Sequence, residues 1–307
     1  QIYECILSGS FLAAGFVVRQ IRDKISAEET MEFCASLLHA DVWKIIASTT
    51  KLAAIRIGFY EYLIAVVQSA PGVIQEYDML KRTSKCLLLD GLQEKESGVF
   101  NHLWPALLAF CKSCPECWQF VSSPHTTLYP RLFAMLRRTT GMMSSAVTYP
   151  SLLPLLMLLP LDVGDPGGIM AFADEFLCAL WRGIESDAMI AMAVPAVVEA
   201  YLECWKYFAL TLPNKALTDP APLQRHLLEH HFLPACLWFL LGSNLRGPFS
   251  HFAETFATAV SRMSGHAIGA LIVNSFWAPL FQALLQALAT GPAPPPPVPE
   301  ATPDNPQ

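Results

Sequence analysis

Three cysteines in one short segment have the residue type and the spacing of metal ligands. Cys111, Cys114 and Cys117 form a Cys-x-x-Cys-x-x-Cys pattern, which resembles part of an iron–sulfur or zinc site. Such a site needs four ligands, and no second Cys or His pair stands nearby at the usual spacing. The segment also continues the apolar helical periodicity that precedes it. We therefore interpret the three thiols as buried side chains near a helix end at Pro115, and we expect no metal there.

Two histidines further along the chain match a short zinc-protease motif. His226, Glu229 and His230 read His-x-x-Glu-His, in which the histidines could hold Zn²⁺ and the glutamate could act as a base. On an α-helix, side chains four residues apart share a face, so both imidazoles could reach one ion. A third protein ligand and an open cleft are also needed, and so short a motif is a weak signal. We interpret the segment as the polar face of a helix and expect no zinc.

Three arginines fall on one predicted helix. Arg131 and Arg138 are seven residues apart on one face, with Arg137 beside them, so they could contact a phosphate backbone. A solvated helix face fits the acidic chain better. The sequence contains no Gly-rich phosphate loop, no nucleophile elbow and no carboxylate pair placed for acid–base work. It therefore predicts no catalytic, cofactor-binding or metal-binding residue, and no cofactor, in this chain.

The elements that carry these residues recur along the chain with a fixed period. Pro105, Pro150 and Pro195 are spaced by 45 residues, each after an apolar residue and followed by a pair of apolar residues; Pro234 and Pro279 have the same spacing. A period of about 40–47 residues built from helix pairs is typical of HEAT and armadillo arrays. No run shows the period-two alternation of strands. The sequence therefore predicts an all-α fold, an α-solenoid of HEAT/armadillo-like helical repeats.

The apolar periodicity places the individual helices. Ser26 is expected to cap one of them in a capping box with Glu29, and Gly91 to stop another. In the most apolar stretch, residues 149–160, Pro154 should kink the helix and Leu153 should lie in the interior. The other predicted helices are residues 3–24 and 55–68, and the pairs 99–117 with 128–139, 146–159 with 169–183, 188–212 with 223–241, and 249–263 with 267–289.

Composition restricts the partners and the compartment. The chain has 307 residues, 53% of them hydrophobic and 15% charged, with a net charge of −6 and a pI near 5.7. An acidic chain argues against broad non-specific nucleic-acid binding, although a local basic patch is allowed. The nine cysteines are odd in number and scattered, which favours reduced thiols in the cytosol over a disulfide framework.

Residues 267–289 are uncharged and long enough to span a bilayer. A polar stripe of Ser275, Gln282 and Gln286, without flanking Lys or Arg clusters, favours a closing helix of the array instead. Residues 290–307 are rich in proline and are expected to form a disordered linker. We therefore expect the repeat array to occupy residues 1–289. Because the chain begins with Gln1 rather than Met, we expect it to be a piece of a longer protein.

A set of short blocks, in register from about residue 26 to residue 241, resembles the N-terminal helical repeats of the listerin family. Listerins are RING-type ubiquitin-protein ligases of ribosome-associated quality control. The block from Tyr149 to Pro154 is the most specific of the set. The blocks are Asp41-Val42-Trp43-Lys44, Ala54-Ile55-Arg56-Ile57-Gly58-Phe59-Tyr60, Leu103-Trp104-Pro105-Ala106-Leu107, Glu116-Cys117-Trp118, Leu128-Tyr129-Pro130-Arg131-Leu132, Val147-Thr148-Tyr149-Pro150-Ser151-Leu152-Leu153-Pro154, Leu158-Leu159-Pro160, Phe176-Leu177 and Tyr201-Leu202-Glu203-Cys204.

The resemblance implies a non-catalytic scaffold within a larger ligase. In the family, a helical array connects an N-terminal, ribosome-binding end to a RING that carries two zinc ions and delivers ubiquitin to nascent chains stalled on the large ribosomal subunit. This chain lacks the RING spacing of Cys and His, so zinc is expected only in the RING, outside this chain.

The partners implied are the large ribosomal subunit with its stalled chain and quality-control factors, and a ubiquitin-conjugating enzyme held by the RING. The resemblance implies no membrane, no sequence-specific nucleic acid and a cytosolic location. The alternative from another class is an unrelated HEAT/armadillo adaptor or transport scaffold.

Overall fold

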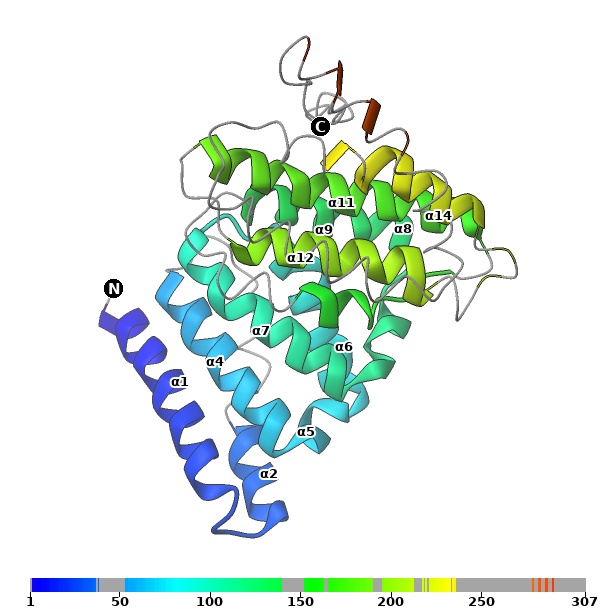
Figure 1. Cartoon of the computed structure of the whole chain (residues 1–307). Coiled ribbons are helices and arrows are strands. Elements are labelled where there is room, and N and C mark those ends of the chain that lie inside the picture. Colours follow the sequence, from blue (N-terminus) through cyan, green and yellow to red (C-terminus); the bar gives the residue numbers. More distant parts are fainter. Residues whose placement is uncertain are drawn as a thin grey trace. The chain divides into compact units, whose positions relative to one another are not determined.

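The computed structural model describes most of the first two thirds of the chain. The described residues are 2–36, 38, 53–139, 152–162, 165–189, 195–212, 217, 219, 221–232 and 234–235, together with 278, 281, 282, 285, 286 and 289. Every regular element among them is helical, and successive helices pack against each other (Figure 1). The predicted fold class, an all-α fold of helical repeats of the α-solenoid type, is confirmed. None of the helices in this described part combines the length and hydrophobicity needed to cross a bilayer.

The chain divides into two compact units, Gln1–Pro160 and Leu161–Gln307. The division falls inside the array predicted for residues 1–289, so one array through both units stays a prediction. The predicted linker at 290–307, the helix at 249–263 and most of 267–289 lie outside the described residues.

The first unit contains a series of helices joined by short turns. They are α1 (Ile2–Ile21), α2 (Ala27–Ser36), α4 (Ala53–Ser69), α5 (Pro71–Gln75), α6 (Tyr77–Ser84), the π-helical turn η1 (Lys85–Asp90), the 3₁₀ turn η2 (Gly91–Gln93), α7 (Ser97–Ser113), the 3₁₀ turn η3 (Pro115–Phe120), α8 (Pro124–Thr127) and α9 (Tyr129–Thr139).

Helix α4 is the centre of this unit. It packs against α1 on one side and α7 on the other (Figure 1). The predicted helix at 55–68 lies within α4, and Ile55, Phe59, Leu63 and Val66, which form one stripe along it, are all fully buried. Burial extends well beyond a stripe, since 11 of the 17 residues of α4 are buried. A helix with neighbours on two sides loses the simple amphipathic pattern of a surface helix.

Local sequence signals set several boundaries of the first unit as predicted. The Ser26–Glu29 capping box is confirmed: the Glu29 N–H donates to Ser26 Oγ at 3.1 Å, and the Ser26 N–H donates to Glu29 Oε2 at 3.0 Å. Helix α7 ends at Ser113, and Pro115 opens a 3₁₀ turn instead of continuing the helix.

Gly91 directly follows the last residue of η1, so a helical element does stop where the sequence predicted. Its backbone is right-handed, with φ of −61°, and it opens the turn η2. A Cβ atom at this position would lie 3.0 Å from the Cys86 carbonyl oxygen and 3.2 Å from Leu103 Cδ1. Glycine suits this position because a larger residue would be crowded by Cys86 and Leu103, and not for its access to positive φ.

A buried ion pair ties α4 to the segment that precedes α7. Arg56 donates from Nε to Glu94 Oε2 at 2.6 Å and from Nη2 to Glu94 Oε1 at 3.0 Å, with a further bond to Glu96 at 3.1 Å. The Arg56 and Glu94 side chains are only 4% and 7% exposed. Burial by itself would lower the pKa of Arg56, but the bonds to the two glutamates raise it overall, so the guanidinium stays charged.

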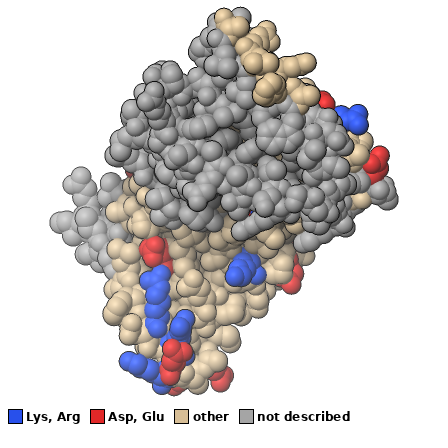
Figure 2. All heavy atoms as spheres, in the orientation of Figure 1, with Lys and Arg blue, Asp and Glu red and all other residues tan. Residues whose placement is uncertain are grey.

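A second, more exposed charge group links three helices. Glu61 of α4 accepts from Arg19 Nη2 of α1 at 3.1 Å, and its other oxygen lies 2.9 Å from His102 Nδ1 of α7. Burial tends to raise the pKa of Glu61, but the hydrogen bonds from His102 and Arg19 lower it overall. Charges of both signs are interleaved where α1 and α2 meet, on the face drawn in Figure 2.

The apolar stretch at residues 152–160 packs into the first unit differently from the prediction. Residues 152–156 are helical, and Tyr129 of α9 holds the end of the stretch by donating its hydroxyl to the Pro160 carbonyl at 2.8 Å. Leu152 and Leu156 are each 1% exposed. Leu153, expected in the interior, is only partly buried. The buried face is therefore one residue out of the predicted register.

The second unit is built around one long helix. It contains α11 (Pro166–Met189), α12 (Pro195–Lys206) with the π turn η4 (Tyr207–Thr211), and α14 (Ala221–Leu227) with the π turn η5 (Leu228–Phe232). Helix α11 contacts both α12 and α14. Its start is capped by Asp165, whose carboxylate accepts from the Gly168 N–H at 3.0 Å. Predicted helix 188–212 is wrong at its start, because residues 188–189 belong to α11.

Aromatic contacts fill the interior of this unit. Phe172, Phe176 and Phe208 form a cluster with ring centroids 5.9–6.0 Å apart. Trp205 stacks on Phe232 at 4.3 Å. These rings fix α11 against η4, and α12 against η5.

The Arg56–Glu94 pair generates a stability prediction. Replacing Arg56 by Met should lower the free energy of unfolding by about 3–5 kcal/mol, because it leaves a buried carboxylate without its cation. Urea denaturation of the variant and the parent chain measures this difference. Arg22→Met is the matched control, since the Arg22–Asp23 pair is exposed and should cost below about 1 kcal/mol. Equal, small losses for both variants would contradict a structural role for the buried pair.

Candidate functional sites

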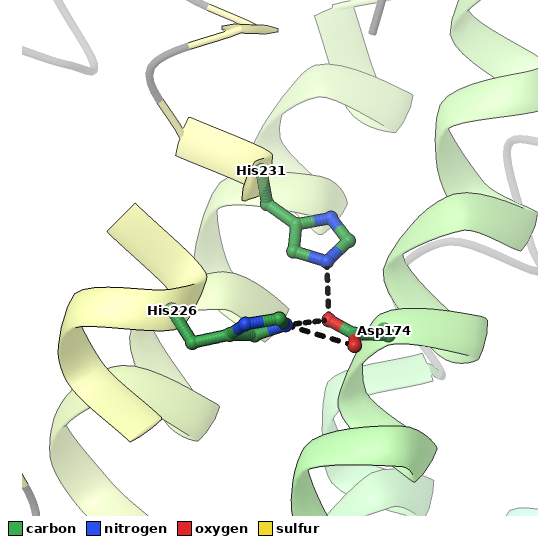
Figure 3. Close-up of side chains that lie close together, drawn as sticks. All are labelled: Asp174, His226 and His231. Atoms are coloured by element: carbon green, nitrogen blue, oxygen red, sulfur yellow. Dashed lines mark hydrogen bonds and ion pairs between the residues drawn. The ribbon is translucent and has the colours of Figure 1, made fainter. Parts of the chain in front are cut away.

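The second unit brings together three polar side chains that lie far apart in the sequence. Asp174 projects from α11, His226 from α14 and His231 from η5, and all three point toward one another (Figure 3). His226 Nε2 lies 2.8 Å and 2.9 Å from the two Asp174 oxygens, and His231 Nε2 lies 2.7 Å from Oδ1. One ligand atom from each residue lies within 4.8 Å of the other two. We call this group the Asp–His cluster.

A π turn explains why His231, and not His230, joins the cluster. In a regular α-helix with 3.6 residues per turn, side chains five positions apart point in directions that differ by roughly 140°, so His226 and His231 would not share a face. The i→i+5 spacing of a π turn brings such residues back toward one face. His231 is therefore buried beside His226, whereas His230 and Glu229 are exposed. His226 and His230 do share a face, as their four-residue spacing predicts, with ring centroids 4.5 Å apart. The side chains that contact Asp174, however, are His226 and His231.

The electrostatics of the Asp–His cluster favour an ionised carboxylate. Burial tends to raise the pKa of Asp174, but hydrogen bonds from His231 and His226, with their charges, lower it overall. The exposed fractions of the side chains are 34% for Asp174, 26% for His226 and 8% for His231. The cluster thus offers one anion and two imidazoles at the edge of the unit, where a proton or a cation can reach them.

The three cysteines near Pro115 are buried, as predicted. Cys111, Cys114 and Cys117 are each 0% exposed. The Cys117 thiol and burial raise the pKa of Cys111 well above its usual range, and burial raises the pKa of Cys114 to about 12. Neutral thiols in apolar surroundings are poor nucleophiles. The grouping of possible metal ligands found among the described residues does not include these cysteines.

The arginines considered for phosphate contact are partly used within the fold. Arg131 donates from Nη1 to the Leu89 carbonyl oxygen at 3.0 Å, so it fixes α9 to η1. Arg137 is half-buried. The side chain of Arg138 lies outside the described residues.

A basic cleft in the first unit was missed by the sequence analysis. It has a volume of about 380 Å³ and lies between α6, η1 and η3. Lys81, Arg82 and Lys85 are all exposed, and Tyr77 packs edge-on against Phe120 with ring centroids 5.3 Å apart at the cleft. The residues that line it are Asp78, Lys81, Arg82, Lys85, Leu89 and Phe120.

Cations beside aromatic rings suit an anionic polymer such as a nucleic-acid backbone. The sequence does contain a sign of this cleft, because the spacing of Lys81, Arg82 and Lys85 places three cations close together on one helical surface. The negative net charge of the chain drew attention away from it.

Comparisons with known proteins give the family. The family model described as "E3 ubiquitin-protein ligase listerin, N-terminal domain" matches residues 1–159. The E3 ubiquitin-protein ligase listerin of Mus musculus is 26% identical over 233 residues, 73% of this chain and 12% of that protein. Its counterpart in Xenopus tropicalis is 25% identical over 257 residues, covering 78% and 14%. That of Gallus gallus is 22% identical over 257 residues, covering 82% and 14%.

No solved structure matches the chain significantly. The chain spans only 12–14% of the length of the curated relatives that it matches. The family match, in contrast, covers more than half of the chain, at the N-terminal domain of the family. The helical repeats and the blocks around Arg56 and Tyr129 are in keeping with that match. The chain therefore belongs to the listerin family, in the region of its N-terminal domain.

Proposed function

We propose that this chain is a non-catalytic scaffold segment of a listerin-type ubiquitin-protein ligase, which ubiquitinates nascent chains stalled on the large ribosomal subunit in the cytosol. The observation that carries the proposal is the match of residues 1–159 to the N-terminal domain of the family. The resemblance implies that ribosome binding belongs to that end of the ligase and ubiquitin transfer to a RING at the other end. The chain therefore contributes binding and position, and no cofactor is needed for either.

The packing of the first unit supports this role, because closely packed helices hold a binding surface in a fixed position. Helix α4 is packed between α1 and α7, and the buried Arg56–Glu94 pair ties it to the start of α7. A scaffold raises a reaction rate by raising the effective concentration of the reacting groups, and a stiff scaffold does this best at one fixed distance.

The basic cleft supports contact with the large subunit in particular. Ribosomal RNA presents a dense array of phosphates, and exposed Lys and Arg side chains bind such arrays by releasing counterions. Lys81, Arg82 and Lys85 are all exposed, and Asp78 is the single acidic residue in the cleft lining. A local positive cleft on a chain of net charge −6 would limit binding at other places on the RNA. We therefore propose the cleft as a phosphate contact that does not read sequence.

Removal of the first unit separates positioning from chemistry. In the intact ligase, deletion of residues 1–160, which end at the boundary between the two compact units, should leave ubiquitin-chain formation with a conjugating enzyme unchanged. Ubiquitination of nascent chains on purified stalled large subunits should fall by about 100-fold or more, the scale on which a second linked binding site strengthens attachment. Both rates are measured on gels with labelled ubiquitin. Circular dichroism must show that the shortened ligase stays folded.

Two results of the deletion would contradict the proposal. Normal ubiquitination of stalled chains would show that the segment does not position the ligase. Loss of free ubiquitin-chain formation in a folded deletion would show that the segment takes part in the chemistry.

Charge reversal tests the cleft separately. Lys81→Glu with Lys85→Glu should weaken binding of the 307-residue chain to large subunits by at least about tenfold at 100 mM salt, because two phosphate contacts become repulsive. The slope of log affinity against log salt should become shallower by about 0.7–0.9 for each phosphate that the variant no longer neutralises. Arg22→Glu with Lys24→Glu is the matched control, with the same charge change at exposed positions after α1. Equal weakening in both variants would point to a general charge effect and would exclude the cleft as the phosphate-binding surface.

A further inference from the structure

The Asp–His cluster has the composition of a metal centre. It consists of two imidazole nitrogens and one carboxylate oxygen, contributed by three elements and all within 4.8 Å of one another. Two histidines and an acidic residue are a frequent ligand set for zinc and for other divalent transition metals. We propose that Asp174, His226 and His231 bind a divalent transition-metal ion, and that the ion is Zn²⁺. The proposal is independent of the proposed function, and it replaces the expectation that the chain binds no metal.

The geometry needs little change to accept the ion. Zn²⁺ binds nitrogen and carboxylate oxygen at about 2.0–2.2 Å, so tetrahedral ligands lie roughly 3.3–3.5 Å from each other. The two Nε2 atoms lie 2.8 Å and 2.7 Å from Asp174 Oδ1. Each of these two N–O distances would have to grow by about 0.5–0.8 Å to reach tetrahedral spacing. The two histidine nitrogens already lie within 4.8 Å of each other, so small side-chain rotations could bring all three ligands around one ion.

The surrounding packing holds the ligands before any ion binds. Tyr201 donates its hydroxyl to the His231 carbonyl at 3.3 Å, and Trp205 donates from Nε1 to the Leu227 carbonyl at 3.1 Å. Trp205 also stacks on Phe232, the last residue of the π turn. These contacts fix η5 in the π form that turns His231 toward α11. Support of this kind keeps a metal site close to its binding geometry.

Exposure of the cluster leaves a path for the ion and room for one more ligand. Asp174 and His226 are about a third and a quarter exposed, whereas His231 lies at the buried end. Three protein ligands with a water in the fourth position is an established coordination of zinc. A bound ion would connect α11 to α14 and η5 more strongly than the present hydrogen bonds from His226 and His231 do, because coordinate bonds would replace them.

Zinc titration of the 307-residue chain, purified in chelator and then freed of it, tests the proposal. Competition with a chromophoric chelator should give one high-affinity site per chain. Asp174→Asn and His231→Gln should each weaken zinc affinity by about 100-fold or more. Mutation of residues that merely support metal ligands already costs about 10–100-fold, and loss of a ligand should cost at least as much. Glu229→Gln is the matched control, at an exposed position of the same π turn, and should keep the affinity. A tenfold excess of Mg²⁺ or Ca²⁺ should not compete, because these ions prefer oxygen ligands.

Further measurements keep the test decisive if a variant is unstable. His226→Gln is a second variant at a more exposed ligand, and thermal unfolding without metal shows which variants are folded. Zinc should raise the melting temperature of the parent chain and not that of the folded ligand variants, because it binds only the native site. Absence of a one-to-one site in the parent chain would overturn the proposal. So would a site that survives all three ligand changes, since it would then lie elsewhere in the chain, or one that disappears on Glu229→Gln alone.

Discussion

The first unit depends on one buried charge pair. Arg56 and Glu94 are almost fully removed from water, so removing either one would leave a charged group buried without this partner. Their double hydrogen bond fixes the segment between η2 and α7, and with it the close approach at Gly91. Helix α4, which carries Arg56, is in turn held between α1 and α7. The elements that form the basic cleft are connected to this same packing, since η1 contacts α7.

Sequence reasoning succeeded where the cause was local. The Ser26–Glu29 capping box needs only a three-residue spacing, and the helix end before Pro115 follows from the missing N–H of proline. The 45-residue proline spacing predicted the right fold class, but the prolines in that series do not occupy equivalent positions in their helices. Pro105 lies inside α7, whereas Pro195 is the first residue of α12. The same sequence pattern, a proline followed by apolar residues, can occur at the start of a helix or in its interior, so the pattern alone does not distinguish the two positions.

The candidate sites could not be read from the sequence because they depend on tertiary and non-standard local geometry. Asp174 lies 52 residues from His226, and no local pattern joins them. His231 reaches them only because α14 continues as a π turn, which the period of 3.6 residues does not foresee. Leu153 shows the same limit on a smaller scale. An apolar run identifies a buried helix, but the tertiary neighbours decide which face is buried, and here Leu152 and Leu156 are buried while Leu153 is only partly so.

We propose, from the family match and the basic cleft, that the chain is a segment of a larger ligase that binds without catalysing. Co-sedimentation of the 307-residue chain with purified large ribosomal subunits carrying a stalled nascent chain tests this claim most directly. The account predicts that the chain sediments with the subunits, that moderate salt releases it, and that added ubiquitin with its activating and conjugating enzymes yields no conjugates. A chain that stays in the supernatant at low salt, or that transfers ubiquitin unaided, would contradict it.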